Sequence, residues 1–153
     1  MDKRIVPEKY SGLRTVLAEH IDGLGHVNNI RYINWCEELA WQHSEQLGLS
    51  VDDYQRLDRA MAVYHAEFDY RAPAFEGQTL RVSTWLSFAK GTRMTRCFEI
   101  IRNDNAQVLM TGVWQLSCIE ISSGKPKRFP EEFVDVYLPE VISSSASVHE
   151  KSG

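Results

Sequence analysis

Three long segments of alternating polarity follow one another in the second half of this chain, and they constrain its fold more than any other feature. They cover roughly residues 78–88, 94–101 and 108–121 of the 153-residue sequence, and short turn sequences separate them at 90–91 and 103–105. A period of two is typical of β-strands, and strands joined by such short turns pair antiparallel. The pattern therefore predicts an antiparallel meander, with Leu80, Val82, Leu86 and Phe88 on one face of its first strand.

A single long helical pattern, at about 28–47, precedes these strands. Its apolar side chains recur at the spacing of one helix face, on which Cys36, Ala40 and Ser44 form a strip of small residues. Asn28 suits the N-cap of this helix and Gly48 its C-terminal stop. We also expect a short helix from about residue 51 and further strands at about 13–20 and 61–70. One early helix and a curling sheet after it predict an α+β architecture in which the sheet covers the helix.

Length, charge and cysteine content exclude several classes of protein. The 153 residues suffice for one domain, expected at 1–140 and followed by a serine-rich tail at 141–153. Cys36, Cys97 and Cys118 show no CxxC spacing, so we expect buried thiols and neither disulfides nor a metal site. The net charge of −4 gives no reason to expect a nucleic-acid partner, and no segment predicts a signal peptide or membrane insertion. These features favour a cytoplasmic protein.

The loop before the helix carries the residues best suited to chemistry. Asp22 and His26 lie in a glycine-containing stretch just ahead of Asn29. A helix N-terminus presents unpaired N–H groups and a partial positive charge, which can hold an oxyanion. A carboxylate beside it can attack an acyl carbonyl as a nucleophile, or activate water as a general base. In the structural alternative, Asp22 caps the turn and His26 fills a polar gap at the helix entrance.

The run DGLGHVNNIRY at residues 22–32 resembles the signature of the hotdog-fold acyl thioesterases, specifically the 4-hydroxybenzoyl-CoA thioesterase-like family. The similarity extends from about residue 13 to residue 138. It implies a hotdog fold, in which a long central helix is wrapped by a curved antiparallel β-sheet. It also implies a homodimer or homotetramer with each active site between subunits, in which Asp22 is the catalytic carboxylate and the backbone N–H at Asn29 polarises the thioester carbonyl.

Two positions depart from related sequences. His20 stands where many relatives carry a second Asp. Plant acyl-carrier-protein thioesterases are similar here, with an Asp, an Asn and a His, but Leu24 occupies the place of their Asn. These departures favour a mechanism that rests on Asp22, with His26 as a positioning or proton-handling group.

A coenzyme A thioester brings phosphates, which need cations. Residues 90–128 hold seven basic and three acidic side chains, a local charge of +4 against −8 for the rest of the chain. We expect Lys90, Thr92 and Arg93 to contact the phosphates, near where the resemblance places such contacts, and exposed cations at 125–128. Solvated strand ends are the alternative interpretation. An apolar slot beside the helix would hold the acyl group, with Trp35, Leu39, Trp41, Tyr64 and Phe68 as candidates that can equally be core residues.

The sequence therefore predicts an acyl-CoA thioester hydrolase that releases a free acid and coenzyme A. Coenzyme A is part of the substrate, and no separate cofactor or metal is expected. A thioesterase that acts on acyl carrier protein is an open alternative, since an acidic carrier would also suit the basic segment. Two further alternatives are a hotdog hydratase or dehydratase and a non-catalytic acyl-CoA binding protein.

Overall fold

The computed structural model describes residues 8–142. Five strands form its sheet, namely β1 (Tyr10–Thr15), β2 (Arg59–Tyr70), β3 (Thr79–Lys90), β4 (Arg93–Arg102) and β5 (Val108–Glu120). Three α-helices accompany them, α1 (Asn29–Leu47), α2 (Val51–Leu57) and α3 (Glu131–Tyr137), with short 3-10 turns at Ala18–His20 and Leu138–Glu140. No helix in this part of the chain is long and apolar enough to cross a membrane.

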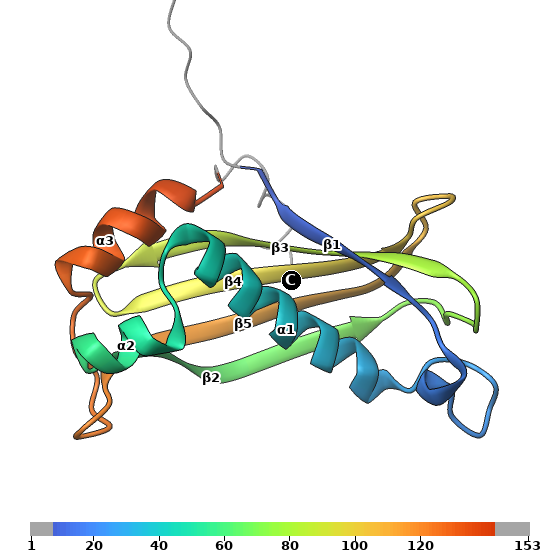
Figure 1. Ribbon diagram of the computed structural model, residues 1–153, viewed down its shortest axis with the longest axis horizontal. Coiled ribbons are helices and arrows are strands. Elements are labelled where there is room, and N and C mark those ends of the chain that lie inside the picture. The colour runs from blue at the N-terminus through green and yellow to red at the C-terminus, as the bar shows by residue number, and fades with distance from the viewer. Residues whose placement is uncertain (1–7, 143–153) are drawn as a thin grey trace, which may run out of the picture.

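The strands pair antiparallel in the order β1-β3-β4-β5-β2. The predicted meander is therefore confirmed as β3-β4-β5, and β1 and β2 complete its two edges. Helix α1 lies across the sheet, while α2 and α3 gather near the end of α1 (Figure 1). This is the predicted α+β architecture of one long helix covered by an antiparallel sheet.

Helix α1 begins and ends where the sequence predicts. The Asn28 side chain accepts a hydrogen bond from the Ile30 N–H at 3.0 Å, and Gly48 adopts the left-handed conformation, with φ 104°, that stops the helix. The small residues Cys36, Ala40 and Ser44 are all buried, the first two in the core with residues of the sheet and Ser44 against Tyr137 of α3. Burial raises the pKa of the Cys36 thiol to about 12, so this cysteine stays a neutral packing residue.

Two strand predictions were wrong in detail. The strand expected at 13–20 ends at Thr15, because the His20 ring accepts the Leu17 N–H at 2.9 Å and closes a 3-10 turn. Phe88 does not share a face with Leu86, because the register shifts between them and turns Phe88 outward to 46% exposure.

The segment after β5 contains a helix that the alternating pattern did not predict. Helix α3 follows Pro130 and carries Glu131 and Glu132 in its first turn, both of which are helix-start signals. Its Phe133 and Tyr137 are fully buried under the second half of α1. Val141 bridges to Leu86 and the Ile142 N–H donates to the Leu86 carbonyl, and the rest of the expected tail lies outside the described residues.

Candidate active site

A tight turn holds Asp22 and His26 together ahead of α1. Ile21 and Val27 form an antiparallel bridge, and the Asp22 N–H donates to the His26 carbonyl at 2.9 Å. The Asp22 Oδ1 atom accepts the Leu24 N–H at 2.8 Å, which leaves Oδ2 3.9 Å from the His26 Nδ1 atom. Both side chains remain about one-third exposed. Asp22 therefore caps its own turn with one oxygen and keeps the other available for chemistry.

The first N–H of α1 has no acceptor among residues 8–142. The Asn28 N–H donates to the His20 carbonyl, and the N–H groups of Ile30 and Arg31 donate to the side chain and carbonyl of Asn28. The N–H of Asn29 stands between them and is free to bind an incoming oxygen. It lies at the positive end of a 19-residue helix dipole.

A surface depression of about 260 Å³ opens beside this N–H. His26, Asn29 and Tyr32 line it from the α1 side, and Tyr70 lines it from the end of β2. The Tyr32 hydroxyl is buried beside the backbone N–H of Ala74. Burial also raises the pKa of this phenol, so it remains a neutral donor. Tyr32, which sequence reasoning did not place among the site residues, thus lines the depression while its hydroxyl stays buried.

Comparison with known proteins identifies this arrangement. The family model of the thioesterase-like superfamily matches residues 16–136. The chain belongs to this superfamily. The match spans the Asp22 turn, all three α-helices apart from the last residue of α3, and most of the sheet. The resemblance that the sequence showed to the hotdog thioesterases is thereby confirmed, and so is the hotdog fold.

Individual relatives agree with the family assignment. A 1,4-dihydroxy-2-naphthoyl-CoA hydrolase of Synechocystis is 30% identical over 77% of this chain and 86% of its own length. The long-chain acyl-CoA thioesterase FadM of Escherichia coli is 27% identical over 72% of this chain and 83% of its own. A Staphylococcus aureus protein solved in complex with CoA is 16% identical, with a TM-score of 0.79, over 88% of this chain and 84% of its own. The protein is a thioester hydrolase of the hotdog fold.

The two basic segments of this thioesterase lie side by side. Lys90, Thr92 and Arg93 form the turn between β3 and β4, and the Phe129 N–H donates to the Gly91 carbonyl at 3.0 Å. Residues 125–128 are thereby held against that turn. Arg93 stacks on the Tyr64 ring at 4.6 Å from its centroid and donates to the Tyr64 hydroxyl. The two segments, together the basic surface of the protein, are therefore neighbours in the fold, and within the second one Lys127 is paired with Glu120 at 2.9 Å.

This basic surface and the Asp22 turn do not meet within one chain. The β3–β4 turn lies at the end of the sheet near α3, whereas α1 begins at the opposite end (Figure 1). Tyr70, the last residue of β2, lies beside Tyr32 near the start of α1, with their ring centroids 5.9 Å apart. Arg93 pairs with Ser117, which in turn pairs with Ala62 near the start of β2.

The residues expected to line an acyl slot divide between the core, a cavity and the surface, where Tyr64 is 52% exposed. Leu39 is fully buried in the core, and Trp35, only 5% exposed and part of the same core, packs edge-on against His20 and Tyr32. Phe68 packs against the same core. Trp41 instead lines a cavity of about 160 Å³ between α1 and the sheet, together with Arg96. Arg96, which contributes to the positive charge of residues 90–128, is only 4% exposed.

Proposed function

We propose that this thioesterase hydrolyses acyl-CoA thioesters with Asp22 as its catalytic carboxylate and the Asn29 N–H as its oxyanion donor. The observation that carries the proposal is the free Asn29 N–H at the start of α1, beside a turn that leaves one Asp22 oxygen uncommitted. The acyl-CoA substrates named for two relatives, and the CoA complex of a third, support the same class of substrate.

The chemistry follows from this geometry. The carbonyl oxygen of the thioester accepts a hydrogen bond from the Asn29 N–H. This hydrogen bond strengthens as negative charge develops on that oxygen. Asp22 either removes a proton from water, whose oxygen attacks the carbonyl carbon, or attacks that carbon itself. The carbon–sulfur bond then breaks and the thiolate leaves to take up a proton. In the second route, water hydrolyses the resulting acyl anhydride and frees Asp22.

The separation of the Asp22 turn and the basic surface supports a dimer. Strand β2 is an edge strand, with β5 as its one neighbour among the described strands, and its Val63 and Tyr64 side chains are exposed. If two copies pair along β2 around a two-fold axis, the end of one strand lies beside the start of the other. One copy then supplies the Asp22 turn, and the other supplies Lys90, Thr92 and Arg93 to the coenzyme phosphates.

A panel of aliphatic and aromatic acyl-CoA esters tests the function directly. We expect thiol release, followed with a thiol-reactive dye, from at least one member of the panel. Enoyl-CoA hydration without hydrolysis would contradict the proposal and favour a hydratase. Parallel assays with the same acyl groups on acyl carrier protein separate the two carriers, because both suit the basic surface.

A further inference from the structure

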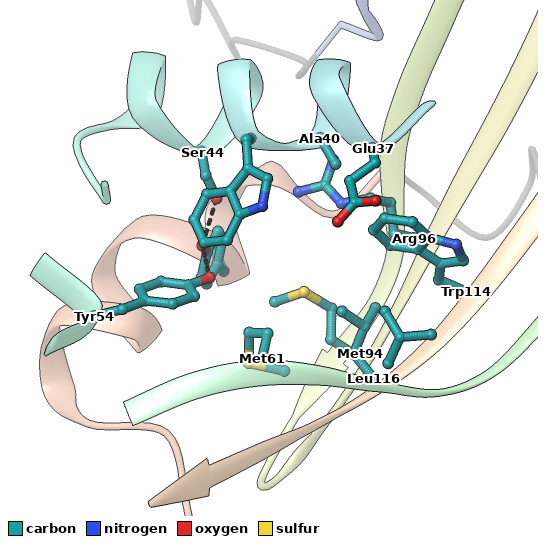
Figure 2. Close-up of a pocket in the computed structure, with 12 residues that line it drawn as sticks. Glu37, Ala40, Ser44, Tyr54, Met61, Met94, Arg96, Trp114 and Leu116 are labelled. Carbon is teal, nitrogen blue, oxygen red and sulfur yellow. Dashed lines mark hydrogen bonds between the residues drawn. The ribbon is translucent and has the colours of Figure 1, made fainter. Parts of the chain in front are cut away.

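The cavity between α1 and the sheet contains a buried arginine that forms no ion pair with any of the described residues. Arg96 rises from the middle of β4 and points toward α1, beside Ala40 and Glu37 (Figure 2). Its Nη1 atom lies 3.0 Å from the Thr84 hydroxyl and 3.1 Å from the His43 Nδ1 atom. Its Nε and Nη2 atoms donate to no acceptor, and no ion pair within residues 8–142 includes Arg96.

None of the buried neighbours of Arg96 supplies negative charge. Burial, reinforced by the Arg96 charge, lowers the pKa of His43 to about 4, so this ring is neutral at pH 7. Burial raises the pKa of both the Tyr54 and the Tyr137 phenol, which hydrogen-bond to each other. An arginine remains protonated even when buried. The buried part of the cavity therefore carries a positive charge, and the carboxylate that lines the cavity, that of Glu37, belongs to an exposed residue.

Apolar side chains line much of the cavity, together with Ser44, Tyr54 and Tyr137, and its volume is small. Trp41 lines it from α1, Met61 from β2, Met94 from β4, and Trp114 and Leu116 from β5. About 160 Å³ is available, close to the size of an engineered cavity of about 150 Å³ that binds benzene. One six-membered ring, or an alkyl chain of similar volume, therefore fits. The lining residues that stay exposed, Glu37 and Val63, mark the mouth between α1 and β2.

We propose that this cavity binds a carboxylate carried on a small apolar body, with Arg96 as its anchor. The free Nε and Nη2 edge of a guanidinium matches the two oxygens of a carboxylate in a bidentate pair, and the Trp and Met walls take the ring or chain. Two sources supply such a group: a free carboxylic acid, which is also the product class of thioester hydrolysis, or an acyl group with a second carboxylate at its far end. The Glu37 carboxylate at the mouth competes with the ligand for Arg96.

Binding of benzoate, measured by isothermal titration calorimetry on the intact protein, tests this site without requiring hydrolysis. We expect saturable binding of benzoate at one site per chain and at least about tenfold weaker binding of neutral benzamide. Arg96→Met should weaken benzoate at least about tenfold, while Arg102→Met, on the same strand but paired with Asp104 at the surface, should leave it unchanged. No benzoate binding, or equal binding by wild type and Arg96→Met, would overturn the proposal.

Two further variants keep the test decisive if Arg96→Met does not fold. Ala40→Leu places a larger side chain in the cavity and should abolish benzoate binding, whereas Glu37→Gln removes the competing charge and should tighten it about twofold or more. Benzoate binding by Ala40→Leu at the wild-type affinity would place the site elsewhere and overturn the proposal.

Hydrolysis assays with thioester substrates distinguish the two sources of the carboxylate. Preferential hydrolysis of 4-carboxybenzoyl-CoA over benzoyl-CoA, lost in Arg96→Met, would identify the acyl group as the source and would rest on the proposed function. An unchanged preference, together with Arg96-dependent benzoate binding, would identify the free acid. Failure of all hydrolysis with retained benzoate binding would refute the proposed function and leave the cavity assignment standing.

Discussion

Asp22 can be changed to asparagine without losing the turn that holds it, because an amide oxygen also accepts the Leu24 N–H. The variant removes the charge and the basicity that either route of hydrolysis requires. We expect Asp22→Asn to lower kcat/KM by at least about 100-fold, measured by thiol release from the best acyl-CoA of the panel. Circular dichroism and the thermal midpoint serve as controls for folding and should match the wild type. Retention of full activity would show that Asp22 only caps the turn.

His43 gives the protein a pH-dependent stability. The folded state keeps the ring neutral, with its pKa lowered from 6.5 to about 4 by burial and by the adjacent Arg96 charge. The unfolded chain binds a proton near its ordinary pKa of about 6.5, so stability falls as the pH drops below that value and levels off below about 4. At pH 5 this loss amounts to about 2 kcal/mol.

His43→Asn isolates that contribution, because an amide oxygen can accept from Arg96 but does not titrate. We expect the free energy of unfolding in urea to fall between pH 7.5 and pH 5.0 by about 2 kcal/mol more in the wild type than in the variant. Equal losses in the two proteins would mean that His43 does not stay neutral in the folded state.

Strand β5 contains a glycine whose place is set by an aromatic ring on the neighbouring strand. Gly112 pairs with Phe68 of β2, and a Cβ atom on Gly112 would lie 2.7 Å from the Phe68 Cδ1 atom. We expect Gly112→Ala to lower the free energy of unfolding by about 1–3 kcal/mol, because the packed ring must move. Gly23→Ala is the matched control, since its added Cβ would meet nothing within 4 Å.

A double-mutant cycle tests this cause. If the ring is the obstacle, Gly112→Ala should cost much less in a Phe68→Leu background, and the two substitutions should show a coupling energy. Additive effects would indicate that the alanine acts through the strand backbone instead.

The elements of the fold differ in how far the sequence could predict them. Helix α1 and the meander follow from periodicity and caps, which are local properties. The register shift that exposes Phe88 inserts one extra residue, and a count of alternating positions does not detect it. Helix α3 carried only short signals, namely Pro130 and two acidic residues, and its burial depends on contacts with α1.

The candidate site divides along the same line. The Asp22 turn and the helix start are contiguous in sequence, so their proximity was predictable. The burial of Arg96 was not predictable, because charge and hydropathy place an arginine at the surface. Only the tertiary arrangement of α1, α2 and α3 around β4 buries it. The separation of Asp22 from Lys90 likewise depends on strand order, which turn sequences do not define.

At the scale of the whole molecule, the basic surface is expected to bind the phosphates of coenzyme A. Lys90→Ala with Arg93→Ala should raise KM for an acyl-CoA about tenfold and leave KM for the same acyl group on pantetheine nearly unchanged. Lys9→Ala, an exposed cation against Trp85 of β3, is the matched control. A similar rise with both substrates would argue against phosphate contacts and for a structural effect through Tyr64.

Whether the Asp22 turn and the basic turn come together in one site depends on how copies of the chain assemble. Because the Asp22 turn and the basic turn lie at opposite ends of one sheet, a single chain cannot hold the thioester and the coenzyme phosphates together in the proposed way. Light scattering after gel filtration should therefore give twice or four times the chain mass of 17.6 kDa.

Val63→Lys, on the exposed edge of β2, introduces like charges at a two-fold interface and should shift the mass toward one chain. The same variant should have lower activity toward acyl-CoA than the wild type. A wild-type protein that hydrolyses acyl-CoA as a 17.6 kDa monomer would contradict the shared site, because the phosphates would then have to bind near the helix start of the same chain.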